Sequence, residues 1–344
     1  MYYPFIIAGP CSAESKEQVL RSASFLKEQG VQLFRASLWK PRTDPDSFCG
    51  VGAQGISWLQ EVQQTVGIEP CTEILLPEHI HLLAEAGIYN MWIGARTTSN
   101  PFIVQTLADT FSQLKHKERL TVMVKNGVTP DINLWMGAVK RLQKAGVENI
   151  IAVHRGFQTA NNSRYRNQPL WSIALQMQQQ MPHIPLLNDA SHITGKSELV
   201  PQCCQQAIDI GFAGLMLEVH PEPEKALSDS RQQLDFNQFN DLKKHLYIHK
   251  HTDDIQLLQL RQQIDEVDEQ ILSLVKERMS VVRKIGKYKQ DRQMPIVQQA
   301  RYEQLIETRT ERACEDGISR QCIETIVNAL HDEAVRQQKL FCSS

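Results

Sequence analysis

The sequence lacks the features that would direct the chain to a membrane or to nucleic acid. No apolar run is long enough to span a bilayer, so we expect no membrane partner. The N-terminal segment MYYPFIIAGPCS has no basic region before its short apolar run, which predicts a first core strand and no signal peptide. The formal net charge of -2 gives no electrostatic reason to expect nucleic acid as a partner. What remains is an ordinary globular composition, with 42% hydrophobic and 22% charged residues.

Cysteine is present, but in no pattern that builds a disulfide framework. The eight cysteines are scattered along 344 residues, and Cys203 and Cys204 are adjacent. Such usage is typical of a reducing compartment, so we expect a cytoplasmic protein. The cysteines also lack a short spacing such as CxxC, so no local motif points to a metal site.

Up to about residue 246, short apolar runs alternate with longer amphipathic stretches. The predicted strands are 5–9, 31–37, 67–74, 88–95, 120–125, 149–154, 184–190 and 211–219. The predicted helices are 16–28, 55–66, 77–86, 101–113, 132–145, 170–180, 199–210 and 236–246. Eight strand–helix repeats predict an α/β fold of the (β/α)8, or TIM barrel, type. A doubly wound open sheet is the alternative, and the absence of a glycine-rich dinucleotide turn favours the barrel.

Proline and glycine become rare after residue 252, where one proline and two glycines remain. Pro295 and the pair Asp316–Gly317 divide this region into three predicted helices, at 253–291, 297–314 and 318–340. We therefore expect a barrel at 1–246, a linker at 247–252 and an all-α domain at 253–344. Apolar residues recur at spacings of three and four along the first of these helices: Leu257, Leu260, Ile264, Val267, Ile271, Leu274 and Val275. Because three helices of unequal length cannot bury the long one, we expect the domain to form a homodimer.

Cationic residues follow four of the predicted strands at the point where each strand ends. The second predicted strand carries Arg35 and leads to the segment 40–43. Arg96 follows the fourth strand, Lys125 ends the fifth, and Arg155 follows the sixth. In a barrel the carboxyl ends of the strands open into one mouth. Each residue alone is also compatible with a solvated loop charge. Together they suit two phosphate-bearing anions, since arginine forks give bidentate contacts and lysines act as point charges.

A second set of residues offers the ligand types of a divalent metal site. Cys11 follows the first strand, His192 follows the seventh, Glu218 ends the eighth, and Asp229 lies in the next loop. A thiolate, an imidazole and two carboxylates suit manganese, iron, zinc or cobalt. Equally, Cys11 can be a small buried apolar side chain and His192 a hydrogen-bonding loop residue. Three other histidines are available by composition: His154, His183 and His220.

The chain from residue 5 to about 235 resembles the type I 3-deoxy-arabino-heptulosonate phosphate (DAHP) synthases, and is most similar to their β-type branch. The matching segments are AGPCS (8–12), RASLWKPRT (35–43), IGARTTSNP (93–101), VKNG (124–127), HRG (154–156), DASHITGK (189–196) and GLMLEVHPEPEKALSD (214–229). Several motifs in the right order make this resemblance specific.

This resemblance implies a metal-dependent, aldol-like condensation of phosphoenolpyruvate with erythrose 4-phosphate. It assigns four residues to the metal: Cys11, His192, Glu218 and Asp229. It places five residues around phosphoenolpyruvate: Arg35, Lys40, Arg96, Lys125 and Arg155. It puts Arg42 and Thr43 with erythrose 4-phosphate, while Lys40 and His192 become candidates for proton transfer. The ketodeoxyoctulosonate phosphate synthases share the fold and the donor, but the KPRT loop favours the four-carbon acceptor.

The helical tail carries ordered cations that would ordinarily form a solvated face. Arg261, Arg278 and Lys289 lie on the first helix, Arg301 opens the second, and Gln338 lies on the third. Converging cations and an amide suit a small dicarboxylate whose ether oxygen gains negative charge as a bond breaks.

Residues 255–340 resemble the all-helical, AroQ-type chorismate mutases, through LRQQIDEVDEQILSLVKERM (260–279), IGKYK (285–289), the arginine that opens the second helix, and DEAVRQQ (332–338). The resemblance implies that Arg261, Arg278 and Arg301 bind carboxylates, Arg261 from the partner chain. Lys289 and Gln338 would hold the ether oxygen. Three positions depart from the family: Gln298, Tyr302 and Ala334 replace two acidic residues and a serine, so we expect weakened activity.

Two functions of the tail remain open. It is either a working mutase, which makes the chain bifunctional, or only a dimerisation module that binds chorismate or prephenate and regulates the barrel. The retained Lys289 and Gln338 favour catalysis. Both functions can coexist, with prephenate inhibiting the barrel through the tail; this hypothesis fails if saturating prephenate leaves the synthase rate unchanged.

Overall fold

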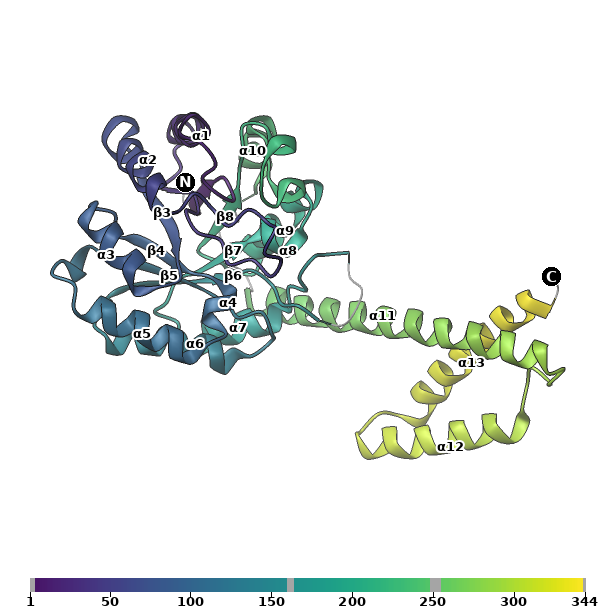
Figure 1. Cartoon of the computed structure of the whole chain (residues 1–344). Coiled ribbons are helices and arrows are strands. Elements are labelled where there is room, and N and C mark those ends of the chain that lie inside the picture. The colour runs from purple at the N-terminus through teal and green to yellow at the C-terminus, as the bar shows by residue number, and fades with distance from the viewer. Residues whose placement is uncertain (1–3, 160–163, 248–254, 343–344) are drawn as a thin grey trace. The chain divides into compact units, whose positions relative to one another are not determined.

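The computed structural model describes residues 4–159, 164–247 and 255–342, and Figure 1 shows the course of the chain. Residues up to 264 form one compact unit, and those from 265 onward form a second. Most of the linker predicted at 247–252 lies outside the described residues. Its first residue, Tyr247, exchanges two 2.8 Å hydrogen bonds with the side-chain amide of Gln205.

The first unit is a closed barrel of parallel strands, paired in chain order from β1 to β8 and back to β1. The strands are β1 (Phe5–Gly9), β2 (Leu33–Arg35), β3 (Glu69–Ile74), β4 (Asn90–Ile93), β5 (Thr121–Lys125), β6 (Asn149–His154), β7 (Leu186–Asp189) and β8 (Gly214–Glu218). The predicted barrel is therefore confirmed, and the open sheet is excluded because β1 pairs with β8 over its whole length.

Helices follow the strands and surround the barrel (Figure 1). They are α1 (Lys16–Glu28), α2 (Ile56–Glu61), α3 (Pro77–Glu85), α4 (Ala95–Thr98), α5 (Pro101–Ser112), α6 (Ile132–Lys144), α7 (Trp171–Gln180), α8 (Ala190–Thr194), α9 (Val200–Asp209) and α10 (Phe236–His245). Local sequence sets their ends. Ser15 accepts a hydrogen bond from the Gln18 amide at the start of α1, and Gly30, at φ 70°, ends that helix and returns the chain to β2. The analysis of sequence periodicity missed α4 and α8, which are too short to show a helical period.

Side-chain alternation divides the barrel interior into two layers. The lower layer is apolar and consists of Ile7, Leu33, Cys71, Trp92, Met123, Val153, Leu187 and Met216. Since side chains of a strand alternate between its faces, the residues two positions further along each strand form the next interior layer. These are Gly9, Arg35, Glu73, Gly94, Lys125, Arg155, Asp189 and Glu218. The barrel thus places an apolar floor beneath a ring of ionisable side chains at its carboxyl end.

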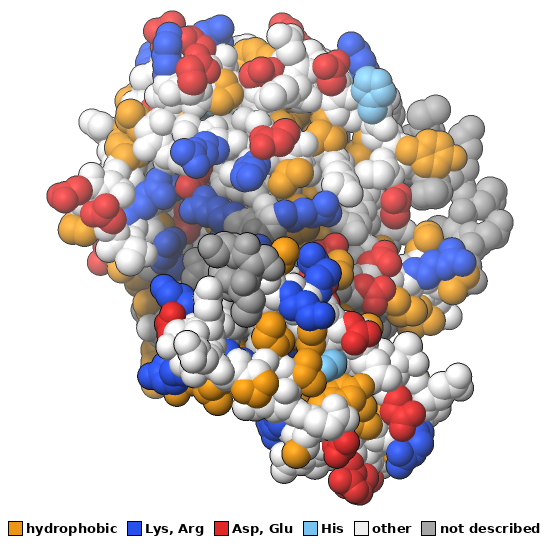
Figure 2. Space-filling model, turned by 90° about the vertical axis from the view of Figure 1, so that its right-hand side faces the viewer, with side chains coloured by type: hydrophobic (Ala, Val, Ile, Leu, Met, Phe, Trp, Pro, Cys, Tyr) orange, Lys and Arg blue, Asp and Glu red, His pale blue; other side chains and the backbone are white. Residues whose placement is uncertain are grey.

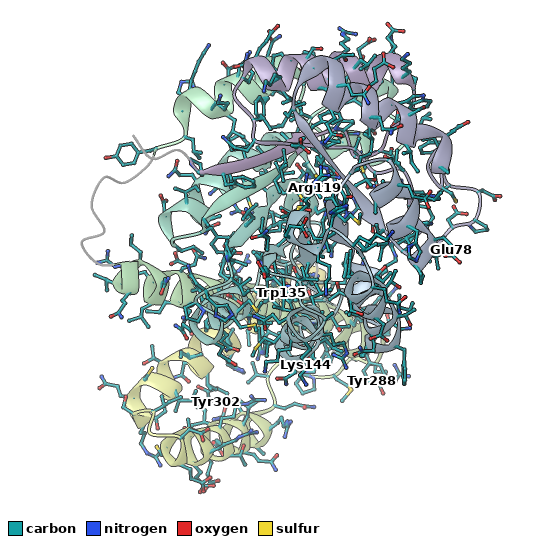
Figure 3. The ribbon with its side chains drawn as sticks, turned by 90° about the vertical axis from the view of Figure 1, so that its left-hand side faces the viewer. Glu78, Arg119, Trp135, Lys144, Tyr288 and Tyr302 are labelled. Atoms are coloured by element: carbon teal, nitrogen blue, oxygen red, sulfur yellow. The ribbon has the colours of Figure 1, made fainter. Side chains whose placement is uncertain are left out.

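The same alternation sends His154 of β6 outward, into the layer of helices. Its ring lies 5.4 Å from that of Trp171 and 6.3 Å from that of Trp135 on α6, with Phe157 and Phe212 also near. Trp135, labelled in Figure 3, donates a 3.0 Å hydrogen bond to the Val124 carbonyl and so packs α6 against β5. Burial among these rings lowers the pKa of His154 to about 3. His154 is therefore a neutral core residue.

The second unit is helical and has a small core. Its helices are α11 (Ile255–Asp291), of which residues 255–264 belong to the first unit, α12 (Gln299–Glu315) and α13 (Arg320–Cys342). Met279 and Val282 of α11 pack against Ala334 of α13, with Val275 and Leu330 at the edge. Many apolar side chains of α11 stay exposed, at spacings of three and four: Leu257, Leu260, Ile264, Val267, Ile271, Leu274, Val281, Ile285 and Tyr288. A single chain therefore leaves one face of α11 uncovered.

None of the described helices combines the length and the apolar composition that crossing a bilayer requires.

The pH dependence of the free energy of unfolding tests the burial of His154 among the aromatic rings. In the folded chain the pKa of His154 lies below its ordinary value, so the unfolded chain binds the proton more tightly. The stability that the neutral, buried ring contributes is therefore present above about pH 6.5 and is lost as pH falls toward 3. The loss amounts to at most about 1.4 kcal/mol per pH unit for one proton. We expect His154→Phe to weaken this dependence in urea unfolding between about pH 7.5 and pH 5. His81→Gln, at an exposed histidine, should leave it unchanged; equal slopes in wild type and His154→Phe would contradict the assignment.

Candidate active sites and metal centre

A cavity of about 180 Å³ opens at the carboxyl end of the barrel. Its lining is rich in cations and includes Lys40, Arg42, Thr43, Glu73, Arg96, Lys125, Arg155, Arg166, His192 and Asp229. Lys and Arg side chains also gather on the face of the molecule seen in Figure 2. A larger cavity of about 800 Å³ lies at the opposite end, beside Phe5, Asn149 and Pro185. We assign the chemistry to the smaller cavity, because barrel active sites form where the strands end.

Arg35 belongs to the same interior layer as Glu73 and Lys125, which line this cavity, and is itself fully buried. Its Nη2 lies 3.0 Å from Glu218 Oε1, and its guanidinium stands 5.1 Å from the ring centre of Trp92. Burial opposes its charge, but Glu218 and Asp189 raise the pKa of Arg35 above its ordinary value. Among the described residues nothing accepts a hydrogen bond from its Nε or Nη1. Buried donors without acceptors are costly, so this guanidinium is suited to a bound anion.

Lys125 and Asp189 form a second buried pair, with Nζ 2.6 Å from Oδ2. Asp189 also caps α8, because its Oδ1 accepts a hydrogen bond from the His192 amide. Burial alone would raise the pKa of Asp189, but His192 and Lys125 hold it well below its ordinary range. The ion pair fixes Lys125 Nζ at 5.6 Å from the Trp92 ring centre.

Arg155 stands on the segment that follows β6. Its Nη1 donates to Asn167 Oδ1 at 3.0 Å, and its backbone amide donates to Asn126 Oδ1 at 2.7 Å. Asn167 in turn donates to the His192 carbonyl at 2.6 Å. Burial lowers the pKa of Arg155 to about 10, which still leaves it charged at neutral pH. Arg155 is therefore a fixed cation at the wall of the cavity.

Three of the residues expected at a metal lie together. Ligand atoms of Cys11, Glu218 and Asp229 are all within 4.8 Å of one another. The Cys11 thiol is 3.2 Å from Asp229 Oδ2, and Lys40 Nζ is 2.8 Å from the sulfur. Asp229 has a left-handed backbone, φ 48°, which aspartate tolerates better than most residues.

His192, the fourth residue expected at the metal, lies beside this cluster. Its Nε2 is 3.7 Å from Glu218 Oε1, while its Nδ1 is 3.0 Å from Asp189 Oδ1. A hydrogen bond from Nδ1 to a carboxylate favours the tautomer whose Nε2 is free to bind a metal. Burial lowers the pKa of His192 more than Asp189 and Glu218 raise it, so the ring is neutral at pH 7.

The charges of this cluster fit a divalent cation. Burial and Glu218 raise the pKa of the Cys11 thiol to about 12, so without a cation the thiol keeps its proton. Burial opposes the charge of Glu218, yet His192 and Arg35 lower its pKa. The pKa of Asp229 is also lowered, by His192 and Lys40 against the effect of burial. Two ionised carboxylates, a thiol and a neutral imidazole are ligand types that zinc, iron, manganese or cobalt accepts.

The KPRT segment forms the rim of the cavity. Arg42 Nη1 is 3.8 Å from Asp229 Oδ2, and Arg42 Nε donates to the Phe48 carbonyl. Thr43 accepts a 3.3 Å hydrogen bond from Arg96 Nη2. These three side chains are more exposed than Arg35 and Lys125, so the cationic site has a deep part and a rim.

The remaining histidines lie elsewhere. His183 contacts Gln143 beside the cavity at the opposite end of the barrel. His220 Nε2 is 3.7 Å from Glu14, and His154 faces the helices. Of the histidines equally available by composition, only His192 reaches the cluster of Cys11, Glu218 and Asp229 in the described part of the chain.

Sequence reasoning missed several residues that shape the site. Asp189 lies in the DASHITGK segment and two positions beyond an interior leucine, so strand alternation could have identified it. Gln233 accepts from the Cys11 amide at 3.0 Å, Gln232 bonds to Glu218, and Arg166 pairs with Asp229. These three come from loops beyond the matching segments, where no period marks them.

In the helical region, the residues expected to bind chorismate make their hydrogen bonds with other residues of α11, α12, α13 and the segments between them. Arg278 donates to the Leu330 carbonyl at 2.8 Å, and Lys289 donates to the Ile296 carbonyl. Arg301 contacts Gln304 on its own helix, and Arg261 is exposed on α11. Gln338 is buried, and no described residue bonds to its Oε1.

Comparisons with known proteins match two different families to successive parts of the chain. The model of the DAHP synthetase I family matches residues 3–255, and that of chorismate mutase type II matches residues 260–339. A phospho-2-dehydro-3-deoxyheptonate aldolase of Thermotoga maritima is 35% identical over 241 residues, which cover 70% of this chain and 68% of that protein. A 2-dehydro-3-deoxyphosphooctonate aldolase of Legionella pneumophila (strain Corby) is 26% identical over 65% of this chain and 84% of its own. The crystal structure of a DAHP synthase from Thermotoga maritima superposes with a TM-score of 0.63 at 33% identity, over 71% of this chain and 68% of that one.

The buried pair of Lys125 and Asp189 can be tested by stability. We expect Lys125→Met to lower the free energy of unfolding by about 3–5 kcal/mol, because it leaves a buried carboxylate without its cation. The double variant Lys125→Met/Asp189→Asn should recover a large part of this loss, since the amide oxygen can still cap α8. Urea unfolding followed by circular dichroism measures both. A double variant less stable than Lys125→Met would show that the pair does not act as a unit.

Proposed function

Since the chain belongs to the DAHP synthetase I family and carries a type II chorismate mutase domain, we propose which residues perform its two shikimate-pathway reactions. The barrel, 1–246, condenses phosphoenolpyruvate with erythrose 4-phosphate. The helical domain, 253–344, rearranges chorismate to prephenate, and 247–252 links the two. The observation that carries the barrel assignment is the buried Arg35 in the interior layer of a cationic cavity, where no described residue accepts a hydrogen bond from its Nε or Nη1.

The deep cations bind the donor. Arg35 and Lys125 lie on the floor beside Trp92, and Lys40, Arg96 and Arg155 line the wall, which gives phosphoenolpyruvate's carboxylate and phosphate separate partners. Arg42 and Thr43 at the rim bind the phosphate of the acceptor. The donor's C3 then lies above the floor, facing the aldehyde, and bond formation leaves a cationic C2 that takes up water and loses phosphate. Glu73 and Asp189, which are fixed among the cations, keep the site from becoming too positive.

A divalent metal fits the cluster of Cys11, His192, Glu218 and Asp229, and when bound it supplies Lewis-acid polarisation of the acceptor aldehyde. Manganese, iron, zinc and cobalt all suit this donor set. Asp189 holds the His192 ring so that Nε2 faces the cluster. Lys40, at 2.8 Å from the Cys11 sulfur, is placed to take up or give a proton at that edge of the cavity.

The acceptor is the four-carbon sugar phosphate. Support comes from the KPRT rim and from the higher identity to the heptonate aldolase, 35%, than to the octonate aldolase, 26%.

The mutase site forms between two chains. A second copy of the chain would cover the exposed apolar face of α11. A homodimer packed along this face would bring Arg261 of one chain toward the other. Arg278 and Arg301 would hold the substrate's carboxylates together with Arg261. Lys289 and the buried Gln338 would stabilise the ether oxygen.

The departures from the mutase family alter secondary contacts. Tyr302 of α12, labelled in Figure 3, donates to Asn328 Oδ1, and its ring centre lies 4.2 Å from that of His331 at an interplanar angle of 37°. Its phenol is therefore occupied within the helical unit. Ala334 is part of the small core with Met279 and Val282, and Gln298 precedes α12 as its N-cap residue. We propose that this mutase works with its cationic core and without the replaced hydroxyl contacts.

Two further features belong to this proposal. Prephenate bound to the helical domain inhibits the barrel, which requires that the two sites prefer different global states. The protein works in the cytoplasm, and its described cysteines, all free thiols, support a reducing compartment.

Metal removal tests the synthase site. We expect a chelator to abolish phosphoenolpyruvate consumption with erythrose 4-phosphate and added manganese to restore it, while arabinose 5-phosphate is a poor acceptor. Cys11→Ser should weaken metal binding by more than the about 10–100-fold typical of residues that only orient ligands. Cys49→Ser, at an exposed thiol, is the matched control. Full turnover in chelator, or a preference for arabinose 5-phosphate, would refute the assignment.

Complementation between inactive variants tests the shared mutase site. Arg261→Ala and Lys289→Ala should each lose chorismate turnover. After subunit exchange, about a quarter of wild-type activity should return, since half of the dimers are mixed and half of their sites are intact. Loss of chorismate absorbance reports the activity, and size-exclusion chromatography with light scattering reports the dimer. If both variants are inactive and the mixture stays inactive, Arg261 acts within its own chain.

A further inference from the structure

Two side chains outside the cluster of Cys11, Glu218 and Asp229 donate hydrogen bonds to its two carboxylates. Gln232, at the end of the short η6 turn (Ser230–Gln232), is 1% exposed and donates from Nε2 to Glu218 Oε2 at 2.7 Å. Its Oε1 accepts a 2.7 Å hydrogen bond from Arg166 Nη1. The same Arg166 nitrogen is 2.9 Å from Asp229 Oδ1. One chain of hydrogen bonds thus runs from Glu218 through Gln232 and Arg166 to Asp229.

This chain occupies one oxygen of each carboxylate and leaves the other facing the cluster. Asp229 Oδ2 lies 3.2 Å from the Cys11 sulfur, while Oδ1 is held by Arg166. Glu218 Oε1 lies 3.7 Å from His192 Nε2 and accepts a 3.0 Å hydrogen bond from Arg35 Nη2, while Oε2 is held by Gln232. The Gln232 amide has only one productive orientation, since its NH2 must meet Glu218 and its oxygen must meet Arg166.

Arg166 itself is fixed by the loop that carries it. Phe157 and Gln168 exchange backbone hydrogen bonds across the base of this loop. The Arg166 amide donates to the Thr194 carbonyl, and the neighbouring Asn167 amide donates to the Ile193 carbonyl of α8. The backbone on which Arg166 stands is therefore attached to the helix that carries His192.

We propose that Arg166 and Gln232 are positioning residues for the metal, which together turn one oxygen of Glu218 and one of Asp229 toward the cation. This inference rests on the proposed metal site. It adds two residues that act on the metal through its carboxylate ligands, and it gives Arg166, on the segment after β6, a part in metal affinity. Hydrogen bonds to a ligand's outer atom fix its direction before the metal arrives, which strengthens binding.

Replacing Arg166 changes the metal affinity in opposite directions for a positioning role and for simple charge repulsion. Arg166 is a positive charge beside a cation site, so its removal should tighten metal binding if only Coulomb repulsion acts. If positioning dominates, Arg166→Met should weaken metal binding. Gln232→Met removes no charge and should weaken it as well, because Glu218 loses its only amide donor among the described side chains.

The experiment titrates cobalt(II) into the metal-free, full-length chain. Competition with a chelator gives the dissociation constant, and visible absorption reports the coordination geometry without any turnover. We expect Arg166→Met and Gln232→Met each to weaken binding by about 10–100-fold and to alter the visible bands. The double variant should lose less than the product of the single effects, because both residues act through one hydrogen-bonded chain. Arg231→Met, at an exposed arginine beside Gln232, is the matched control and should bind like wild type.

The outcomes are distinct. A wild-type chain that binds no cobalt refutes the metal site and this inference with it. Wild-type binding with unchanged or tighter binding in Arg166→Met refutes the positioning role alone. If Gln232→Met fails to fold, as judged by circular dichroism, the half-exposed Arg166 still decides the question.

Discussion

The buried carboxylate of Glu218 is the group on which the rest of the barrel mouth depends. It accepts from Arg35 on one oxygen and from Gln232 on the other, and its backbone amide is held by the Ser191 hydroxyl. A charge removed from water at this depth is tolerable only when partners surround it. The partners belong to the proposed sites as well, since Arg35 is assigned to the donor in our proposal and the Ser191 contact attaches α8, which carries His192. A change at Glu218 would therefore reach both the anion site and the metal cluster.

The charges of the interior layer are balanced in pairs. Arg35 with Glu218 and Lys125 with Asp189 account for two cations and two carboxylates, and the indole of Trp92 lies beneath both cations. A Cβ at Gly94 would lie 1.9 Å from Glu73 Oε1, so a larger residue there would displace the Glu73 carboxylate. Such a layer is already organised before a ligand binds, which is how a site stabilises developing charge without rearranging.

The sequence predicted much of this arrangement because periodicity and strand alternation are local properties. The strand at 149–154 and the helix at 16–28 agree with the structure at both ends, and the exposed apolar face of α11 is the one that its spacing predicted. The short helices α4 and α8 were missed, although they carry Arg96 and His192, since one turn has no period to detect. Choosing His192 over His154 required the family resemblance, yet alternation from Val153 already sends His154 outward. Arg166 and Gln232 could not be predicted, because their partners are more than 60 and about 14 positions away along irregular loops.

The apolar floor has a consequence for the order in which substrates bind. Trp92 and its neighbours close the barrel beneath Arg35 and Lys125, so molecules enter and leave through one opening. In the proposed assignment, the cations that bind phosphoenolpyruvate lie deep in that opening, whereas Arg42 and Thr43 stand at its rim. An acceptor bound at the rim would then block the way to the deeper cations. Under that assignment, the depth of the residues would require phosphoenolpyruvate to enter first and the sugar phosphate to close the entrance behind it.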